Sequence, residues 1–424
     1  MLSVVSMIYI GIYLLTLLLA SAELTSLSVA ALIGAALSTL FGIILGVFTP
    51  EEVIGFIDFR VILLLVGVMV TFEVVERSGL FRVIALYAIK YSKGDPRILF
   101  FSLCFVSAAL SLFLSDVTAI LLIAAAAGTI AKIMDYDPVP YFVSAAIMIN
   151  LGGTSTLIGS TSNMIIGIAS GLSFIDFLYY LAPCEITLWI LTSFALYLLY
   201  KPRLGEKKTP PTYDPWSEIK DRRTVYKAGF VIILFLILFL LYEKWNVGPE
   251  TIAFLCAVLA LIIVDVDAGT VFRQIDWETI FFIGGFLIII GGLERTGVLS
   301  AITRMVLGMA HGSSFSASLL TLWSSALLSV FVSNIAVALT YTPIIGMMKD
   351  LNLNMTSLWS SLILGTNLGG AATPVSGAVC VLAIGALKEE NVNLSFIDFS
   401  KAGVLTTIIQ LAFATLYLIL RFGV

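Results

Sequence analysis

Polar residues interrupt two long apolar runs of this sequence at matching places. Ser115, Asp116 and Thr118 stand in the middle of one run, and Ser333 and Asn334 stand in the middle of the other. Polar groups are costly at membrane depth and mark solute sites or ion pathways there. We therefore expect these residues to bind substrate, and Asp116, the acidic one, to bind the coupling proton. The alternative is that Ser115 and Asp116 only cap the following helix.

A second pair of polar segments combines glycine pairs with hydroxyl groups. One runs from Asn150 to Asn163 and the other from Asn367 to Gly377. Because Gly-Gly followed by Ser, Thr or Pro does not continue a regular helix, each predicts a spanning helix that is broken near its middle and exposes backbone groups to a site. The alternative is a packing face of small residues. The candidate substrate ligands here are Asn150, Gly152, Gly153, Thr154, Thr156, Asn163, Asn367, Gly369, Gly370, Thr373 and Pro374.

Three other acidic residues are weaker candidates. Glu73 and Glu76 stand with Arg77 at the end of an apolar run, where an interfacial ion pair would anchor the amphipathic helix that follows. Glu185 follows Pro183 inside another run. It is either a buried functional group or a residue at the membrane boundary.

The composition defines the kind of protein that positions these residues. The chain has 424 residues, of which 60% are hydrophobic and 12% are charged, about half the charged fraction of a soluble domain. A net charge of −4 offers no basic surface for nucleic acid. One histidine and four scattered cysteines build neither a metal site nor an acid–base pair. We expect a membrane protein that is not an enzyme and holds no cofactor or metal.

Continuous apolar runs predict an all-α polytopic fold with about ten crossings. The two halves of the chain repeat one another, since Leu172–Phe177 recurs identically as Leu394–Phe399. A polar stretch between the halves carries a Pro-Pro pair and a cluster of basic residues. We therefore expect a first repeat at 1–200, a basic linker at 201–223 and a second repeat at 224–424.

The number of apolar runs predicts that the repeats are inverted. Each half contains one long run, 97–134 or 314–348, that crosses twice or enters and returns as a hairpin. The other runs number five in each half, so each half crosses an odd number of times. With the linker in the cytoplasm and both termini outside, 17 of the 23 Lys and Arg residues lie on the cytoplasmic side, as the positive-inside rule requires of a cell-membrane protein.

Three motifs resemble those of the ion transporter superfamily, which includes arsenical pump membrane proteins (ArsB), P-proteins, citrate and dicarboxylate transporters and sodium/proton antiporters. Leu151–Asn163 is similar to its first glycine-rich signature, Gly365–Gly385 to the second, and Phe113–Leu122 to its Asp-Asn-Val-Thr-like motif. The resemblance covers essentially the whole chain and is nearest to the ArsB branch. Cys380 departs from it, because the motif has Asn at that place.

The resemblance implies a secondary transporter that works by alternating access, often as a homodimer. On the ArsB side it implies proton-coupled transport of arsenite, antimonite or a related small anion, with a cytoplasmic ATPase subunit as a possible partner. The alternatives are a sodium-coupled citrate or dicarboxylate symporter and a sodium/proton antiporter. A polytopic enzyme and a channel are the rivals from other classes.

Overall fold

The chain is helical throughout the part that the structure describes. This computed structural model describes residues 3–21, 24–114, 116–208, 215–216, 219, 221–374, 378–389, 392 and 394–423, with the backbone alone at 116, 117, 129–133, 378 and 389. No strand occurs in these residues. The expected all-α fold is therefore confirmed.

The described residues of each half form ten α-helices in the same order, as the repeat predicts. The first half contains α1 (Val4–Ser21), α2 (Leu27–Ile44), α3 (Pro50–Gly55), α4 (Phe59–Arg77), α5 (Leu80–Ser92), α6 (Pro96–Ser111), α7 (Asp116–Met134), α8 (Val139–Gly152), α9 (Thr161–Ser170) and α10 (Phe174–Tyr200), followed by the short 3-10 helix η1 (Lys201–Arg203). The second half contains α11 (Arg222–Leu241), the 3-10 helix η2 (Tyr242–Trp245), α12 (Pro249–Val264), α13 (Ala268–Gln274), α14 (Trp277–Arg295), α15 (Val298–Ala310), α16 (Ser314–Ser329), α17 (Asn334–Gly346), α18 (Met355–Gly369), α19 (Ala378–Glu389) and α20 (Phe396–Phe422).

The two repeats use the same residues to start and turn their helices. Ser173 and Ser395 cap the two long helices α10 and α20, and each hydroxyl accepts a hydrogen bond from the N–H three residues later, which satisfies a donor that the helix cannot pair. Gly79 and Gly297 have φ values of 82° and 76° before α5 and α15. This left-handed conformation is one that glycine adopts without strain.

Each repeat contains a helical hairpin and a broken helix. In the hairpin α6–α7 the chain turns back after Ser111, and in α16–α17 it turns back after Ser329. The 16 residues of α6 span about 24 Å, and α7 packs back along α6, so the two arms together add no net crossing. Six described helices are long and apolar enough to cross a bilayer on their own. With the broken helices and shorter apolar helices, about ten crossings result.

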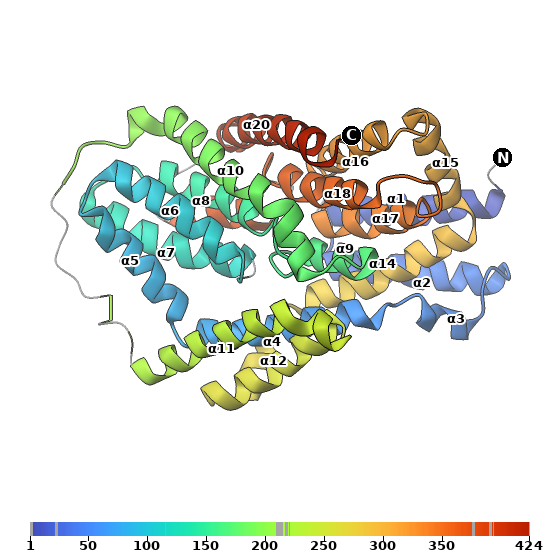
Figure 1. Cartoon of the computed structure of the whole chain (residues 1–424), viewed down its shortest axis with the longest axis horizontal. Helices are drawn as coiled ribbons and strands as arrows, with labels where there is room; N and C mark the ends of the chain where they lie inside the picture. The colour runs from blue at the N-terminus through green and yellow to red at the C-terminus, as the bar shows by residue number, and fades with distance from the viewer. Residues whose placement is uncertain are drawn as a thin grey trace.

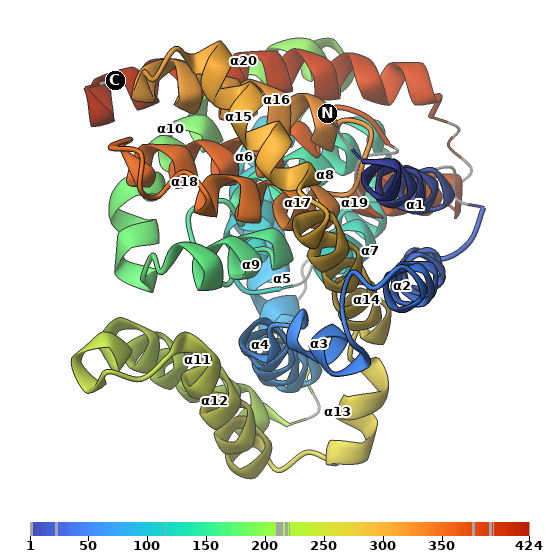
Figure 2. The ribbon, with the colours of Figure 1, turned by 90° about the vertical axis from the view of Figure 1, so that its right-hand side faces the viewer.

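The repeats interlock through reciprocal contacts. Helix α4 packs along α12 and α14 packs along α2, so each of these pairs joins the two halves. The helices after the breaks also change partners, because α9 packs on α17 and α19 packs on α7. In Figures 1 and 2, α4, α11 and α12 form one side of the molecule, whereas α16, α18 and α20 lie on the opposite side.

Two short helices were not expected from the hydropathy pattern. The apolar run at 26–48 is longer than the helix that it forms, because α2 ends at Ile44 and Gly46 turns the chain with a φ of 65°. Helix α3 then starts with Pro50 in its first turn, behind a capping box formed by Thr49 and Glu52. Helix α13 takes the corresponding place in the second repeat. Six or seven residues are too few for a hydropathy signal.

Candidate functional site

Asn163 holds the first broken helix in a closed loop. Its Nδ2 group donates to the carbonyl oxygens of Gly153, Thr154 and Thr156 at 2.9, 3.1 and 2.8 Å. A Cβ atom on Gly153 would lie 2.2 Å from the carbonyl oxygen of Gly159, so glycine is required where the two ends of the loop meet. The loop between α8 and α9 is therefore built around one buried amide.

A chain of three asparagines joins the two breaks. The Nδ2 group of Asn367, on α18, donates to Oδ1 of Asn163 at 2.8 Å, and Nδ2 of Asn150 donates to the carbonyl oxygen of Asn367 at 2.7 Å. All three side chains are buried. The sequence placed these amides 204 and 217 positions apart, and the fold brings them into one cluster. We call Asn150, Asn163 and Asn367 the asparagine cluster.

The tip of the second hairpin reaches this cluster. A Cβ atom on Gly370 would lie 2.7 Å from Nδ2 of Asn334 and 3.0 Å from Oδ1 of Asn150, so Gly370 lets a hairpin side chain and a break side chain approach one point. Within the described residues, Oδ1 of Asn334 has no hydrogen-bond partner. Ser333 caps α17 through a bond from the N–H of Ile335 at 3.3 Å. The second tip thus offers a buried amide oxygen beside the breaks.

The threonines among the predicted ligands differ in what their hydroxyl groups contact. The Thr373 hydroxyl donates to the carbonyl oxygen of Val330 at 3.1 Å and ties the second break to the second tip. The Thr154 hydroxyl donates to Leu151 within its own loop at 2.7 Å. Oγ1 of Thr156 has no partner among the described residues, and Pro374 is buried.

Gly152 and Gly369 lie where each broken helix crosses its hairpin. A Cβ atom on Gly152 would lie 2.2 Å from the carbonyl oxygen of Ala108, and one on Gly369 would lie 2.3 Å from that of Ala326. These are equivalent positions of the two repeats. The pair thus fits the packing role that glycine pairs can have, and it positions the predicted ligands on both sides of it.

The first hairpin tip is described only in part. Ser115 lies outside the described residues, and the side chain of Asp116 does too. Thr118, on the first turn of α7, hydrogen-bonds the carboxyl group of Glu76. The ion pair expected at the end of α4 forms between Arg77 and Glu73, with Nε and Oε1 2.7 Å apart, so Glu76 is free to face the hairpin.

Sequence reasoning left two residues of this region unresolved. It treated Glu76 as part of an anchor, because its place near the end of a span gives no sign of a contact with α7. It left the depth of Glu185 open, and the structure shows that this side chain is 1% exposed in the middle of α10. Its place in an apolar run after Pro183 was the available signal.

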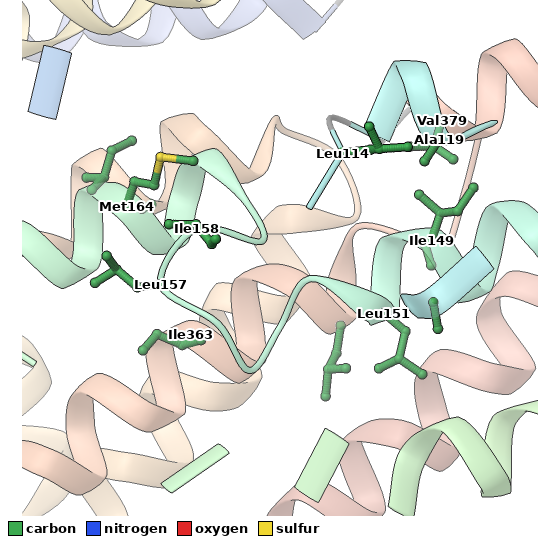
Figure 3. Close-up of a cluster of buried hydrophobic side chains, with 14 of the residues drawn as sticks. Leu114, Ala119, Ile149, Leu151, Leu157, Ile158, Met164, Ile363 and Val379 are labelled. Carbon is green, nitrogen blue, oxygen red and sulfur yellow. The ribbon is translucent and has the colours of Figure 1, made fainter. Parts of the chain in front are cut away.

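Apolar side chains enclose the polar loop. Figure 3 shows Leu157, Ile158 and Met164 around the first break, with Ile363 of α18 beside them. Hydrogen bonds in such a low-dielectric environment are strong, and unpaired polar groups are costly. Within the described residues, no group of three His, Cys, Asp or Glu side chains could hold a metal ion. The site therefore offers amides, hydroxyls, backbone groups and the start of α17 to a small polar or anionic solute.

Proteins of several bacteria are similar to this chain in sequence over most of its length. The profile described as "Citrate transporter" matches residues 16–365. The chain is 30% identical to the 46 kDa membrane protein of Mycobacterium leprae, over 98% of this chain and 99% of that one. It is 28% identical to an uncharacterized transporter of Mycobacterium tuberculosis, over 87% of each chain.

A solved structure has the same fold. The crystal structure of the YdaH transporter of Alcanivorax borkumensis, described as having an unusual topology, matches with a TM-score of 0.64 over 99% of this chain and 98% of that one. Its sequence identity is 17%, so the likeness concerns the fold alone. Together with the family profile, which matches most of the chain, the relatives identify a multi-pass membrane transporter and not an enzyme. The chain belongs to the citrate transporter family.

Proposed function

We propose that this protein is a secondary active transporter that moves a small anion by alternating access, driven by an ion gradient. The observation that carries the proposal is the asparagine cluster, which joins the two broken helices, together with Asn334 of the second hairpin beside it. Broken helices that meet inside a membrane protein form solute and ion sites in secondary transporters. Because the cluster contains residues of both repeats, a movement of one repeat against the other would change the contacts of the solute bound there.

The proposed substrate class is a small carboxylate or a related inorganic oxyacid. Citrate-type carboxylates are suggested by the family profile. Arsenite and antimonite are suggested by the motif at Phe113–Leu122. The N-terminus of α17 favours an anion, and Oδ1 of Asn334, unpaired among the described residues, can accept a hydrogen bond from a hydroxyl group of a polar solute.

The experiment is a flux assay with the purified protein in liposomes. Uptake of labelled citrate and of arsenite would be measured separately with an imposed pH gradient, with an imposed sodium gradient, and with neither. Gradient-driven accumulation of either solute supports the proposal and names the driving ion. Flux that only equilibrates each solute, whatever the gradient, would indicate a channel and overturn it.

For the coupling ion we propose the proton, bound by Asp116 at the first hairpin tip. The second repeat has neutral Asn334 at the corresponding place, so the acidic group belongs to the first repeat alone. Asp116→Asn keeps the shape of the side chain and removes its titration. We expect this variant to exchange solute across the membrane without proton-driven accumulation. Unchanged proton-coupled accumulation would exclude Asp116, and dependence on sodium would favour the symporter alternative.

Orientation and assembly are part of the same proposal. We place linker 201–223 in the cytoplasm and both termini outside, with the protein acting as a homodimer and an ATPase subunit as an optional partner. Single cysteines introduced at exposed Lys207 and Lys244 would be labelled from opposite sides of the membrane. Labelling of both from one side would refute this topology, and the mass of the complex in native detergent extracts tests the dimer.

A further inference from the structure

The middle of α10 contains a buried carboxyl group that the proposed function does not use. Glu185 is 1% exposed, and Nε1 of Trp189, one turn later, donates to its Oε1 at 3.0 Å. Its Oε2 atom has no hydrogen-bond partner among the described residues. A buried ionised carboxylate is very costly unless a cation or a proton neutralises it. A retained acid in such a place is a functional group by default.

The carboxyl group faces the loop of the first break. Both the hydroxyl and the backbone N–H of Ser155, in the loop between α8 and α9, act on the Glu185 carboxyl group. Neither bonds Oε2 at hydrogen-bond distance. The loop that Ser155 belongs to is the one that Asn163 closes. A change in the charge of Glu185 therefore acts directly on a loop of the candidate solute site.

The second repeat shows that packing does not require an acid here. Thr407 takes the equivalent place on α20, and its hydroxyl donates to the carbonyl oxygen of Leu368, at the second break, at 3.3 Å. Ala372 corresponds to Ser155 in the second break. Both helices thus contact the break of their own repeat, one through a neutral hydroxyl and the other through a carboxyl group.

No described charge close to Glu185 balances it. On its own helix, Cys184 is close enough to Glu185 for the two groups to interact electrostatically. Cys184 also interacts electrostatically with Tyr417 of α20. The buried titratable side chains of α8 and α6 are those of Tyr141 and Cys104. The charged or titratable residues of the elements around α10 otherwise stand toward helix ends: Arg97, Lys201, Arg203, Arg222, Arg223, Tyr226, Lys227, Asp398, Lys401 and Arg421.

We propose that Glu185 is a proton-binding group of the transport cycle, whose protonation state sets the conformation of the loop between α8 and α9. With a proton bound, the neutral carboxyl group keeps its bond from Trp189 and tolerates the apolar surroundings. When the proton leaves, the carboxylate attracts the N–H and hydroxyl of Ser155 more strongly and pulls the break loop toward α10. The inference rests on the proposed function for the coupling, and the binding of the proton is tested separately.

Trp189 is a built-in reporter for the proton. Its fluorescence contribution would be obtained as the difference between the wild type and Trp189→Phe, in purified protein over a pH series with and without sodium. We expect a pH-dependent step in this difference that is absent from the Glu185→Gln background and present with Glu243→Gln, a control at an exposed carboxyl group. A step that persists in Glu185→Gln, no step at all, or a step that sodium alone produces would overturn the proposal.

Coupling is tested by comparing exchange with accumulation of labelled citrate in liposomes whose voltage is clamped. A gradient of about one pH unit coupled to one proton sustains an accumulation ratio of about tenfold. We expect Glu185→Gln to lower this ratio about tenfold, the contribution of one proton, while citrate exchange continues, and Thr407→Val to leave the ratio unchanged. If exchange and accumulation fall together, Glu185 is structural and the proposal fails. If the wild type moves no citrate, the substrate proposal fails and the fluorescence result still decides whether Glu185 binds a proton.

Discussion

Replacing Asn163 by alanine tests whether the broken helix depends on one buried amide. In the structure this side chain bonds three carbonyl oxygens of its own loop and accepts a bond from Asn367. Alanine removes these bonds and cannot replace them. Asn367 keeps a second bond, from its Nδ2 to the carbonyl oxygen of Ile363 at 2.8 Å, so the damage should concentrate in the first break.

The magnitude follows from the number of carbonyl groups that lose a donor. Of the three carbonyl groups, that of Thr156 keeps the N–H of Gly159 at 3.3 Å, so within the described residues those of Gly153 and Thr154 are left without a donor. Each buried carbonyl left without a donor costs about 1–3 kcal/mol. The expected loss in the free energy of unfolding is therefore about 2–6 kcal/mol, which is large against the stability of most proteins.

The assay is unfolding of the purified protein in detergent, followed by helical circular dichroism. Gln274→Ala is the matched control, because it removes an exposed amide at the end of α13 and should change stability by less than about 0.5 kcal/mol. If Asn163→Ala is as stable as this control, water replaces the amide inside the loop. The loop between α8 and α9 would then be hydrated, which would refute the inference that its apolar surroundings exclude water.

Two further predictions concern packing and pH. Gly152→Ala should lower stability by about 1–3 kcal/mol through overpacking, whereas Gly308→Ala, which meets no atom within 4 Å, should raise it by up to about 1 kcal/mol; thermal unfolding of both variants checks this. The Thr224 hydroxyl and the Arg223 N–H donate to Asp221, at the start of α11, and hold the pKa of that carboxyl group below its ordinary value. Its contribution to stability is therefore complete above the ordinary pKa of an aspartate and is lost as the pH falls through the lower, folded-state pKa. Acid unfolding of Asp221→Asn should lack that component.

Much of the architecture could be predicted because the two halves of the sequence repeat the same signals. The capping residues Ser173 and Ser395 and the turn glycines Gly79 and Gly297 stand at equivalent positions. They fix where helices begin, and hydropathy fixes which segments enter the membrane. Both signals are local along the chain.

The contacts between helices could not be predicted in the same way. Spacing gives the position of Asn163 along its helix, but not that its amide points into its own loop while its oxygen meets Asn367. Likewise, nothing local shows that Glu76 turns toward Thr118. Such contacts depend on how helices rotate and which repeat they pack against, and only the folded arrangement determines both. The proposed solute role of these residues stays a prediction until flux is measured.

The exchange of partners between repeats has a consequence for biosynthesis. Helix α9 leaves the ribosome long before α17, on which it packs, and α7 must likewise wait for α19. The first half of the chain therefore enters the bilayer with its hairpin and broken helix lacking their final neighbours. The last quarter of the nascent chain completes both, so the order of translation makes the C-terminal helices the step that commits the whole protein to its native state.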